Sequence, residues 1–171
     1  MKLFDMTLFE TFPASSRVWI YQAPRPLTIE EREVTSALLE DFMEVWAAHG
    51  TKLKCDYTIL YKRFVVLVVD EGVQPATGCS IDDSVGEIKK ISEAINVDLF
   101  DRMNVAFVSD NGLVVSASMA DFEEMTNNGD IDENTTVFNN MLTTLGEVRE
   151  KWEGPVKNSW QSRYLKSAPS A

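Results

Sequence analysis

Short apolar runs rich in β-branched and aromatic residues recur along the N-terminal part of the chain. Such runs are typical of strands, and their bounds predict strands over 18–21, 57–61, 64–69, 105–108 and 113–115. Phe64–Val69 is apolar at every position rather than alternating, which is typical of a strand buried on both faces. Lys62-Arg63 is poor chemistry for a two-residue hairpin turn, so we expect a longer or bulged connection before this strand.

Two longer stretches carry apolar residues every three or four positions, the spacing of an amphipathic helix. In the first, Thr28 with Glu31 forms a capping box and Gly50 supplies the C-terminal stop. In the second, Ser80 with Asp83 forms another capping box and begins the helix. The first helix follows the first predicted strand, and the second helix follows the third predicted strand.

The predicted order is β-α-β-β-α-β, the ferredoxin-like arrangement, in which helices cover one face of a sheet. We therefore expect an α+β fold with this core over 17–116, after a lead-in of 1–16. A mixed helical extension over 117–166 is expected to pack on the core as part of one structural domain. Because Phe64–Val69 requires cover on both faces, this extension is expected to cover the second face, and a homodimer through an uncovered face is the alternative.

Composition and charge indicate the number of domains, the partners and the cellular compartment to expect. The 171 residues suit one domain, and 44% hydrophobic with 25% charged residues is an ordinary globular composition. A net charge of −11 repels phosphate backbones and anionic lipid, so neither nucleic acid nor a membrane is an expected partner. Asp5 and Glu10 interrupt the start before a secretory signal develops, so we expect a bacterial-type cytoplasmic protein with reduced thiols at Cys55 and Cys79.

The loop 72–80 leads from the central strand into a helix, as a phosphate-binding loop does. That motif has four residues between its glycines and then a lysine that reaches the phosphates. Here five residues separate Gly72 from Gly78, and Cys79 stands where the lysine belongs. We favour a structural role, in which Gly78 relieves a tight turn and Ser80 caps the helix.

A ligand site at the same place is the alternative, because backbone amides at a helix start bind anions without a lysine. Asp82 opposes it by satisfying part of the helix dipole. A thiol at a helix start can act as a nucleophile, although a buried structural cysteine is the commoner outcome. The residues of this candidate site are Thr77, Gly78, Cys79, Ser80 and Asp82.

Other candidate chemistry is incomplete. His49 is the only histidine, which excludes a multi-histidine metal site, and we expect it in the last turn of the first helix. Asp130 begins a segment like a calcium loop, but Thr135 and Met141 stand where that loop needs glycine and glutamate. We expect neither a metal nor a cofactor.

Several short segments form a distinctive set, and they are Val18–Gln22, Ala48–Gly50, Gly78–Ser80 with Asp82 and Ser84-Val85, Leu99–Arg102, Phe138–Asn140, and Pro155–Lys157 with Ser159-Trp160. As a set they resemble a family of small bacterial proteins often labelled "ABC transporter ATPase", over about 17–164. The resemblance implies no catalytic or binding residues. It adds ATP binding by a degenerate loop as a hypothesis.

Our leading hypothesis is a binding or interaction domain without a complete catalytic motif, rather than an enzyme. The first alternative is an enzyme or small-ligand (anion) binder that uses the loop Thr77–Asp82. The second is a degenerate ATP-binding protein.

Overall fold

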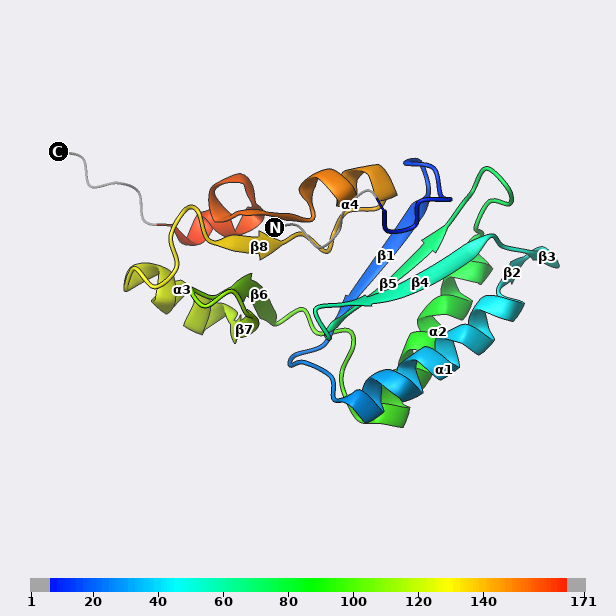
Figure 1. The fold of residues 1–171 in the computed structure, drawn as a ribbon, viewed down its shortest axis with the longest axis horizontal. Coiled ribbons are helices and arrows are strands. Elements are labelled where there is room, and N and C mark those ends of the chain that lie inside the picture. The colour runs from blue at the N-terminus through cyan, green and yellow to red at the C-terminus, as the bar shows by residue number, and fades with distance from the viewer. Residues whose placement is uncertain (1–6, 166–171) are drawn as a thin grey trace. The chain divides into compact units, whose positions relative to one another are not determined.

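The computed structural model describes residues 7–165 and shows a mixed α+β fold (Figure 1). The chain forms two compact units. One comprises Met1–Asp101 with Asn140–Glu150, and the other comprises Arg102–Asn139 with Lys151–Ala171. None of the helices within 7–165 is long and apolar enough to cross a membrane.

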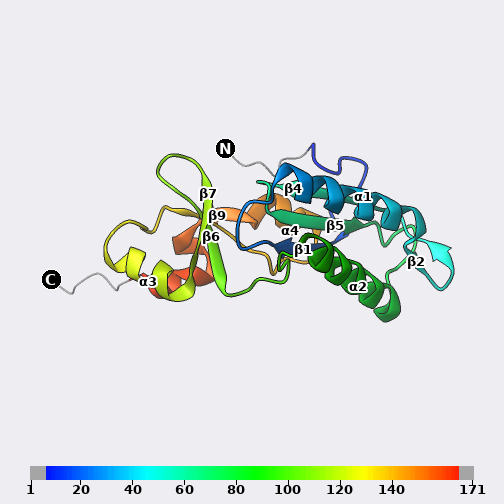
Figure 2. The same cartoon turned by 90° about the horizontal axis from the view of Figure 1, so that it is seen from below.

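A three-stranded antiparallel sheet forms the centre of the first unit, in the order β1-β5-β4. These strands are Arg17–Gln22, Phe64–Val69 and Cys55–Leu60. The helix α1 (Ile29–Val45) connects β1 to β4, and α2 (Gly78–Ile95) follows β5. Figure 2 shows the two helices side by side against one face of this sheet.

The central strand β5 is buried at all six positions, which confirms the prediction from its unbroken apolar pattern. Val65, Leu67 and Val69 join the apolar cluster that contains Leu39 and Ile91 of the two helices. The alternate residues, which point to the other face, are also fully buried: Phe64, Val66 and Val68. Both faces of β5 are therefore covered within the described residues, and a homodimer stays a prediction.

Segments from both ends of the first unit contribute to this cover. The ammonium of Lys54 lies 4.8 Å from the ring centroid of Phe12 and donates to the carbonyl of Thr11 at 2.8 Å. Leu145 and Val148 of α4 (Leu145–Lys151) are buried. The side chain of Arg149 donates to the carbonyl of Leu8 at 2.9 Å. Part of the C-terminal third, Asn140–Glu150, thus belongs to the first unit.

The predicted ferredoxin-like sheet is not completed, because its fourth strand lies elsewhere. The expected strand 105–108 lies in β6 (Asn104–Val108), which belongs to the sheet of the second unit. Two short segments occupy the free side of β1 instead. Gln22 forms a parallel bridge with Phe100, and the amide of Val18 donates to the carbonyl of Thr143 at 2.9 Å. A local apolar pattern predicts a strand but does not identify its neighbours.

The second unit contains a four-stranded sheet in the order β7-β6-β8-β9, and all its pairs are antiparallel. Phe122 of α3 (Met119–Asn127) is fully buried and packs with Val105, Phe107 and Val137. The chain ends its described part in two 3-10 helices, η1 and η2. The remaining bounds in this unit are Val114–Ser118 for β7, Thr136–Phe138 for β8, Glu153–Pro155 for β9, Val156–Asn158 for η1 and Trp160–Tyr164 for η2.

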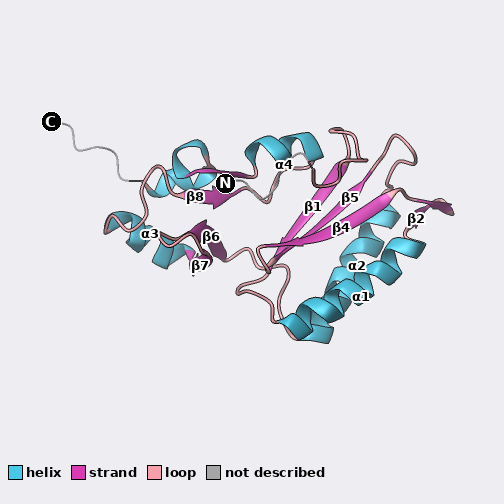
Figure 3. Ribbon diagram, in the orientation of Figure 1, coloured by secondary structure: helices cyan, strands magenta, loops and turns pink. Residues whose placement is uncertain are grey.

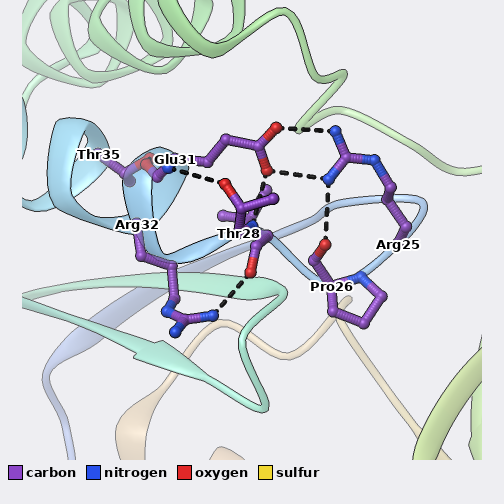
Figure 4. A network of polar contacts seen from close by, with 7 residues as sticks. Arg25, Pro26, Thr28, Glu31, Arg32 and Thr35 are labelled. Carbon is purple, nitrogen blue, oxygen red and sulfur yellow. Dashed lines mark hydrogen bonds and ion pairs between the residues drawn. The ribbon is translucent and has the colours of Figure 1, made fainter.

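The start of α1 confirms the predicted capping box. The Thr28 hydroxyl accepts from the Glu31 amide at 3.1 Å, and the Glu31 carboxylate accepts from the Thr28 amide at 2.9 Å. Figure 4 shows that both terminal nitrogens of Arg25 also donate to this carboxylate, at 2.9 and 2.8 Å. The bond from Arg25 is the main reason that the pKa of Glu31 falls to about 2.

The end of α1 differs from the prediction. The helix stops at Val45, and β2 (Ala47–Ala48) and β3 (Thr51–Lys52) form a hairpin in its place. His49 and Gly50 are the turn of this hairpin, with φ of 50° and 76°. Two successive positive φ values are typical of a type I′ turn, so His49 does not lie in a helix and Gly50 does not end one.

The connection between β4 and β5 is longer than two residues, as the chemistry of Lys62-Arg63 predicted. The chain reverses over 61–63, and Tyr61 and Lys62 both have positive φ, at 50° and 61°. The amide of Arg63 donates to the carbonyl of Leu60 at 3.0 Å and closes the turn.

Candidate functional site

The predicted ligand loop is the first turn of α2, and this helix begins three residues earlier than expected. Thr77 rather than Ser80 is the N-cap: its hydroxyl accepts from the Ser80 amide at 3.2 Å, and the Ser80 hydroxyl accepts from the Thr77 amide at 2.7 Å. The predicted box of Ser80 with Asp83 is therefore wrong. Thr77 and Ser80 are both residues that favour the N-cap position, and only the path of the chain selects between them.

The predicted role of Gly78 is also wrong. It is the first helical residue, its φ is not positive, and no atom lies within 4 Å of the position that a Cβ would take. An alanine would fit the same backbone and space, so no tight turn depends on glycine here.

Most polar groups of the predicted site already serve the fold. The hydroxyls of Thr77 and Ser80 cap the helix, and Ser80 is 1% exposed. The thiol of Cys79 is exposed, so the commoner expectation of a buried cysteine is wrong, and Asp82 is exposed one turn further along. The structure thus brings the five predicted residues together as a helix start rather than as a pocket.

Two carboxylates at the end of β5 hold the loop that precedes this helix. Asp70 Oδ1 accepts from the amide of Gly72 at 3.0 Å, and Glu71 Oε2 accepts from the amide of Ala76 at 3.1 Å. Arg17 lies 3.7 Å from Glu71, and Lys54 lies 3.6 Å from Asp70. These acids organise the loop from within, and residues 7–165 contain no group of three or more His, Cys, Asp or Glu placed to hold a metal.

A buried cation can mark a binding site, and Arg63 is the buried cation of the first unit. Only 2% of its surface is exposed. Burial lowers the pKa of this guanidinium, and the nearby charge of Asp101 opposes that shift. Because so little of the side chain reaches solvent, Arg63 offers no surface on which a ligand could dock.

The edge of β4 is the feature of the first unit that leaves backbone groups unused. Figure 3 shows β4 as an outermost strand of its sheet. The amide of Asp70 donates to the carbonyl of Lys54 at 2.9 Å. This bond shows which residues of β4 hydrogen-bond to β5 and which do not. In an antiparallel pair the hydrogen-bonding direction alternates, so the backbone groups of Cys55, Tyr57 and Ile59 point away from β5.

No backbone group within 7–165 pairs with these three outward residues. One outward amide has a side-chain acceptor, because Asp56 Oδ1 accepts from the amide of Tyr57 at 2.8 Å. Two outward amides and three outward carbonyls remain for solvent or for a partner strand. An unpaired edge of this kind is a template for strand addition.

The side chains of the same three residues anchor the edge to the core. Cys55, Tyr57 and Ile59 are half-buried and pack against the apolar cluster between the sheet and its helices. The hydroxyl of Tyr57 contacts a carboxylate oxygen of Glu40 on α1 at 3.1 Å. Burial raises the pKa of Tyr57, and Glu40 adds to that rise.

Acidic groups surround this edge. Glu40 and Glu44 are exposed on α1, one turn apart, and Asp56 is exposed on β4 itself. One cation lies among them: the ammonium of Lys52 is 3.7 Å from the sulfur of Cys55. Burial raises the pKa of the Cys55 thiol, with Lys52 opposing the shift, so the thiol adds no negative charge at neutral pH.

No known protein family, curated protein or solved structure matches the chain. The resemblance to the family labelled "ABC transporter ATPase" therefore stays a prediction, and the geometry of the chain itself carries the argument about function.

Sequence reasoning missed the β4 edge because it predicted the strand but not its place in the sheet. The predicted bounds 57–61 also began two residues late and left out Asp56. A signal was present in hindsight: a charged residue inside a short strand is a common protection of an edge.

Proposed function

We propose that this chain is a binding domain that takes up an extended segment of a partner by strand addition at the edge of β4. The observation that carries the proposal is the set of outward backbone groups on Cys55, Tyr57 and Ile59, which no backbone of the described residues pairs. Main-chain hydrogen bonds of this kind supply affinity in domains that bind extended peptides.

The position of the edge supports binding. β4 pairs along its whole length with β5, a strand buried at every position, and its outward residues pack on α1. An incoming strand would therefore meet a preformed template, and little ordering of the domain would oppose binding. The opposite edge of the sheet, on β1, is already in contact with Phe100 and Thr143.

The alternatives have less support. At Thr77–Asp82 the amides of Thr77 and Ser80, which an anion site would use, already donate to capping hydroxyls, and Cys79 has no histidine beside it in the chain. ATP binding would need a lysine where Cys79 stands.

A neutral peptide tests the proposal. The probe is a blocked peptide about seven residues long that alternates valine and threonine, enough to match a strand of ordinary length. We expect it to shift the amide resonances of Cys55, Tyr57 and Ile59 more than those of Thr58 and Leu60, whose amides face β5. Shifts confined to other parts of the chain, or none up to the solubility limit, would overturn the proposal.

A matched pair of variants separates strand addition from packing. Ile59→Pro removes an outward amide without removing a bond to β5, because proline is tolerated at the exposed side of an edge strand. Ile59→Ala loses similar packing but keeps the amide. We expect the proline variant to lose the peptide shifts and the alanine variant to retain them.

A further inference from the structure

The charges around the β4 edge indicate the chemistry of the partner, and this inference rests on the strand addition proposed above. Glu40 and Glu44 lie on the helix side of the edge. Glu40 contacts the hydroxyl of Tyr57 directly, and the charge of Glu44 acts on Cys55. A strand that pairs with β4 would pass over these two carboxylates.

Asp56 adds a third carboxylate in the plane of the edge. Its Oδ1 accepts from the Tyr57 amide at 2.8 Å, the central outward donor of the strand. A partner carbonyl that takes this amide displaces the carboxylate. The displaced carboxylate of Asp56 is exposed, so it is free to pair with a cationic side chain of the partner.

From these observations we infer that the occupant is an extended segment rich in lysine or arginine. Cationic side chains on its helix side pair with Glu40 and Glu44, and one beside Asp56 replaces the displaced amide. Lys52, the cation noted beside Cys55, also donates to the carbonyl of Leu53 at 2.9 Å, so it is partly engaged within the chain. The chain as a whole, with a net charge of −11, attracts such a segment at long range.

A second copy of this chain fits the edge less well. Two β4 strands that pair antiparallel about Tyr57 are related by a two-fold axis perpendicular to the sheet, so both α1 helices lie on the same face. Glu40 and Glu44 would then face the same carboxylates of the copy. Like charges brought together across an interface oppose association.

The test compares three blocked peptides of equal length that alternate valine with lysine, threonine or glutamate. At low salt we expect the lysine peptide to bind about fivefold to tenfold more tightly than the threonine peptide, the gain typical of a few exposed ion pairs. The glutamate peptide should bind more weakly than both. Added salt should reduce the difference, because the pairs are exposed to solvent.

A charge-neutralising variant tests whether the preference for the lysine peptide comes from the acidic residues at the β4 edge. Glu40→Gln, Glu44→Gln and Asp56→Asn together should lower the affinity for the lysine peptide to that for the threonine peptide. Asp121→Asn, Glu123→Gln and Glu124→Gln make the same change of charge on α3 and should leave the preference intact.

The outcomes distinguish this inference from the proposal beneath it. Equal binding of all three peptides at the edge overturns the charge preference and leaves strand addition standing. Failure of all three overturns strand addition itself. A dimer that Ile59→Pro abolishes, without peptide binding by the monomer, identifies a second copy as the occupant and overturns the cationic partner.

Discussion

The indole N–H of Trp46, at the end of α1, donates to the carbonyl of Ser80, in the first turn of α2, at 2.8 Å. Both residues are 1% exposed. A buried indole N–H requires an acceptor, so this bond holds the end of one helix beside the start of the other. The ring also packs on Trp19 and Phe42, at centroid distances of 5.8 and 5.1 Å.

Trp46→Phe should lower the free energy of unfolding by about 2 kcal/mol, because it removes the donor and leaves a small cavity. Urea unfolding followed by far-UV circular dichroism measures this without relying on tryptophan fluorescence. Trp160→Phe is the control, since Trp160 is 40% exposed and should cost less than about 0.5 kcal/mol. Equal losses in the two variants would contradict the role of the buried bond.

Two glycines should respond in opposite directions to alanine. Gly86 lies inside α2, and no atom lies within 4 Å of the position of a Cβ, so Gly86→Ala should stabilise by about 0.5–1 kcal/mol. Gly50 has a φ of 76° in the hairpin turn, so Gly50→Ala should destabilise by about 1 kcal/mol despite similar free space. Thermal unfolding of the two variants beside the wild type gives both signs. The same sign in both would show that this turn is not formed as described.

The pair of Glu31 with Arg25 should make stability depend on pH. The pKa of Glu31 is lowered from 4.5 to about 2, so its contribution is present above about pH 4.5 and is lost as the pH falls toward 2. Glu31→Gln should therefore be less stable than the wild type at neutral pH, and the difference should shrink over this acid range. The effect should be modest and smaller at high salt, because Arg25 is half exposed.

Urea unfolding at a series of pH values measures that difference. Glu30→Gln, in the same exposed turn, serves as the control for removing one acidic group near the helix start. A difference for Glu31→Gln that stays constant from neutral pH to about pH 2 would argue against the lowered pKa.

The two thiols should react at different rates with an aromatic disulfide reagent at neutral pH. Cys79 is exposed, whereas Cys55 is partly buried and burial raises its pKa, which lowers the fraction of reactive thiolate. We expect one fast and one slow phase. Cys79→Ser should remove the fast phase and Cys55→Ser the slow one, and a fast phase that survives Cys79→Ser would show that the helix start is covered.

Much of the first unit could be predicted because its signals are local. The unbroken apolar run of β5 specified burial on both faces, and Thr28 with Glu31 specified the start of α1. The candidate site at Thr77–Asp82 was less predictable, since Thr77 and Ser80 are both favoured N-cap residues and the actual box of α2 uses a serine where the usual pattern has an acid. The β4 edge had only the weak signal of Asp56, because every strand has outward groups until its neighbours are known.

By itself, the sequence determined the buried strand β5 and the capped start of α1, since hydrophobic spacing and capping act over a few residues. It also determined the acidic charge of the chain, although not which acidic residues gather beside β4. Only the tertiary structure decided that 105–108 joins the second sheet, that β1 is flanked by short segments and that β4 lies at an edge. Those outcomes depend on which distant segments meet, and pairing between strands is fixed by contacts far apart in the chain that no local pattern encodes.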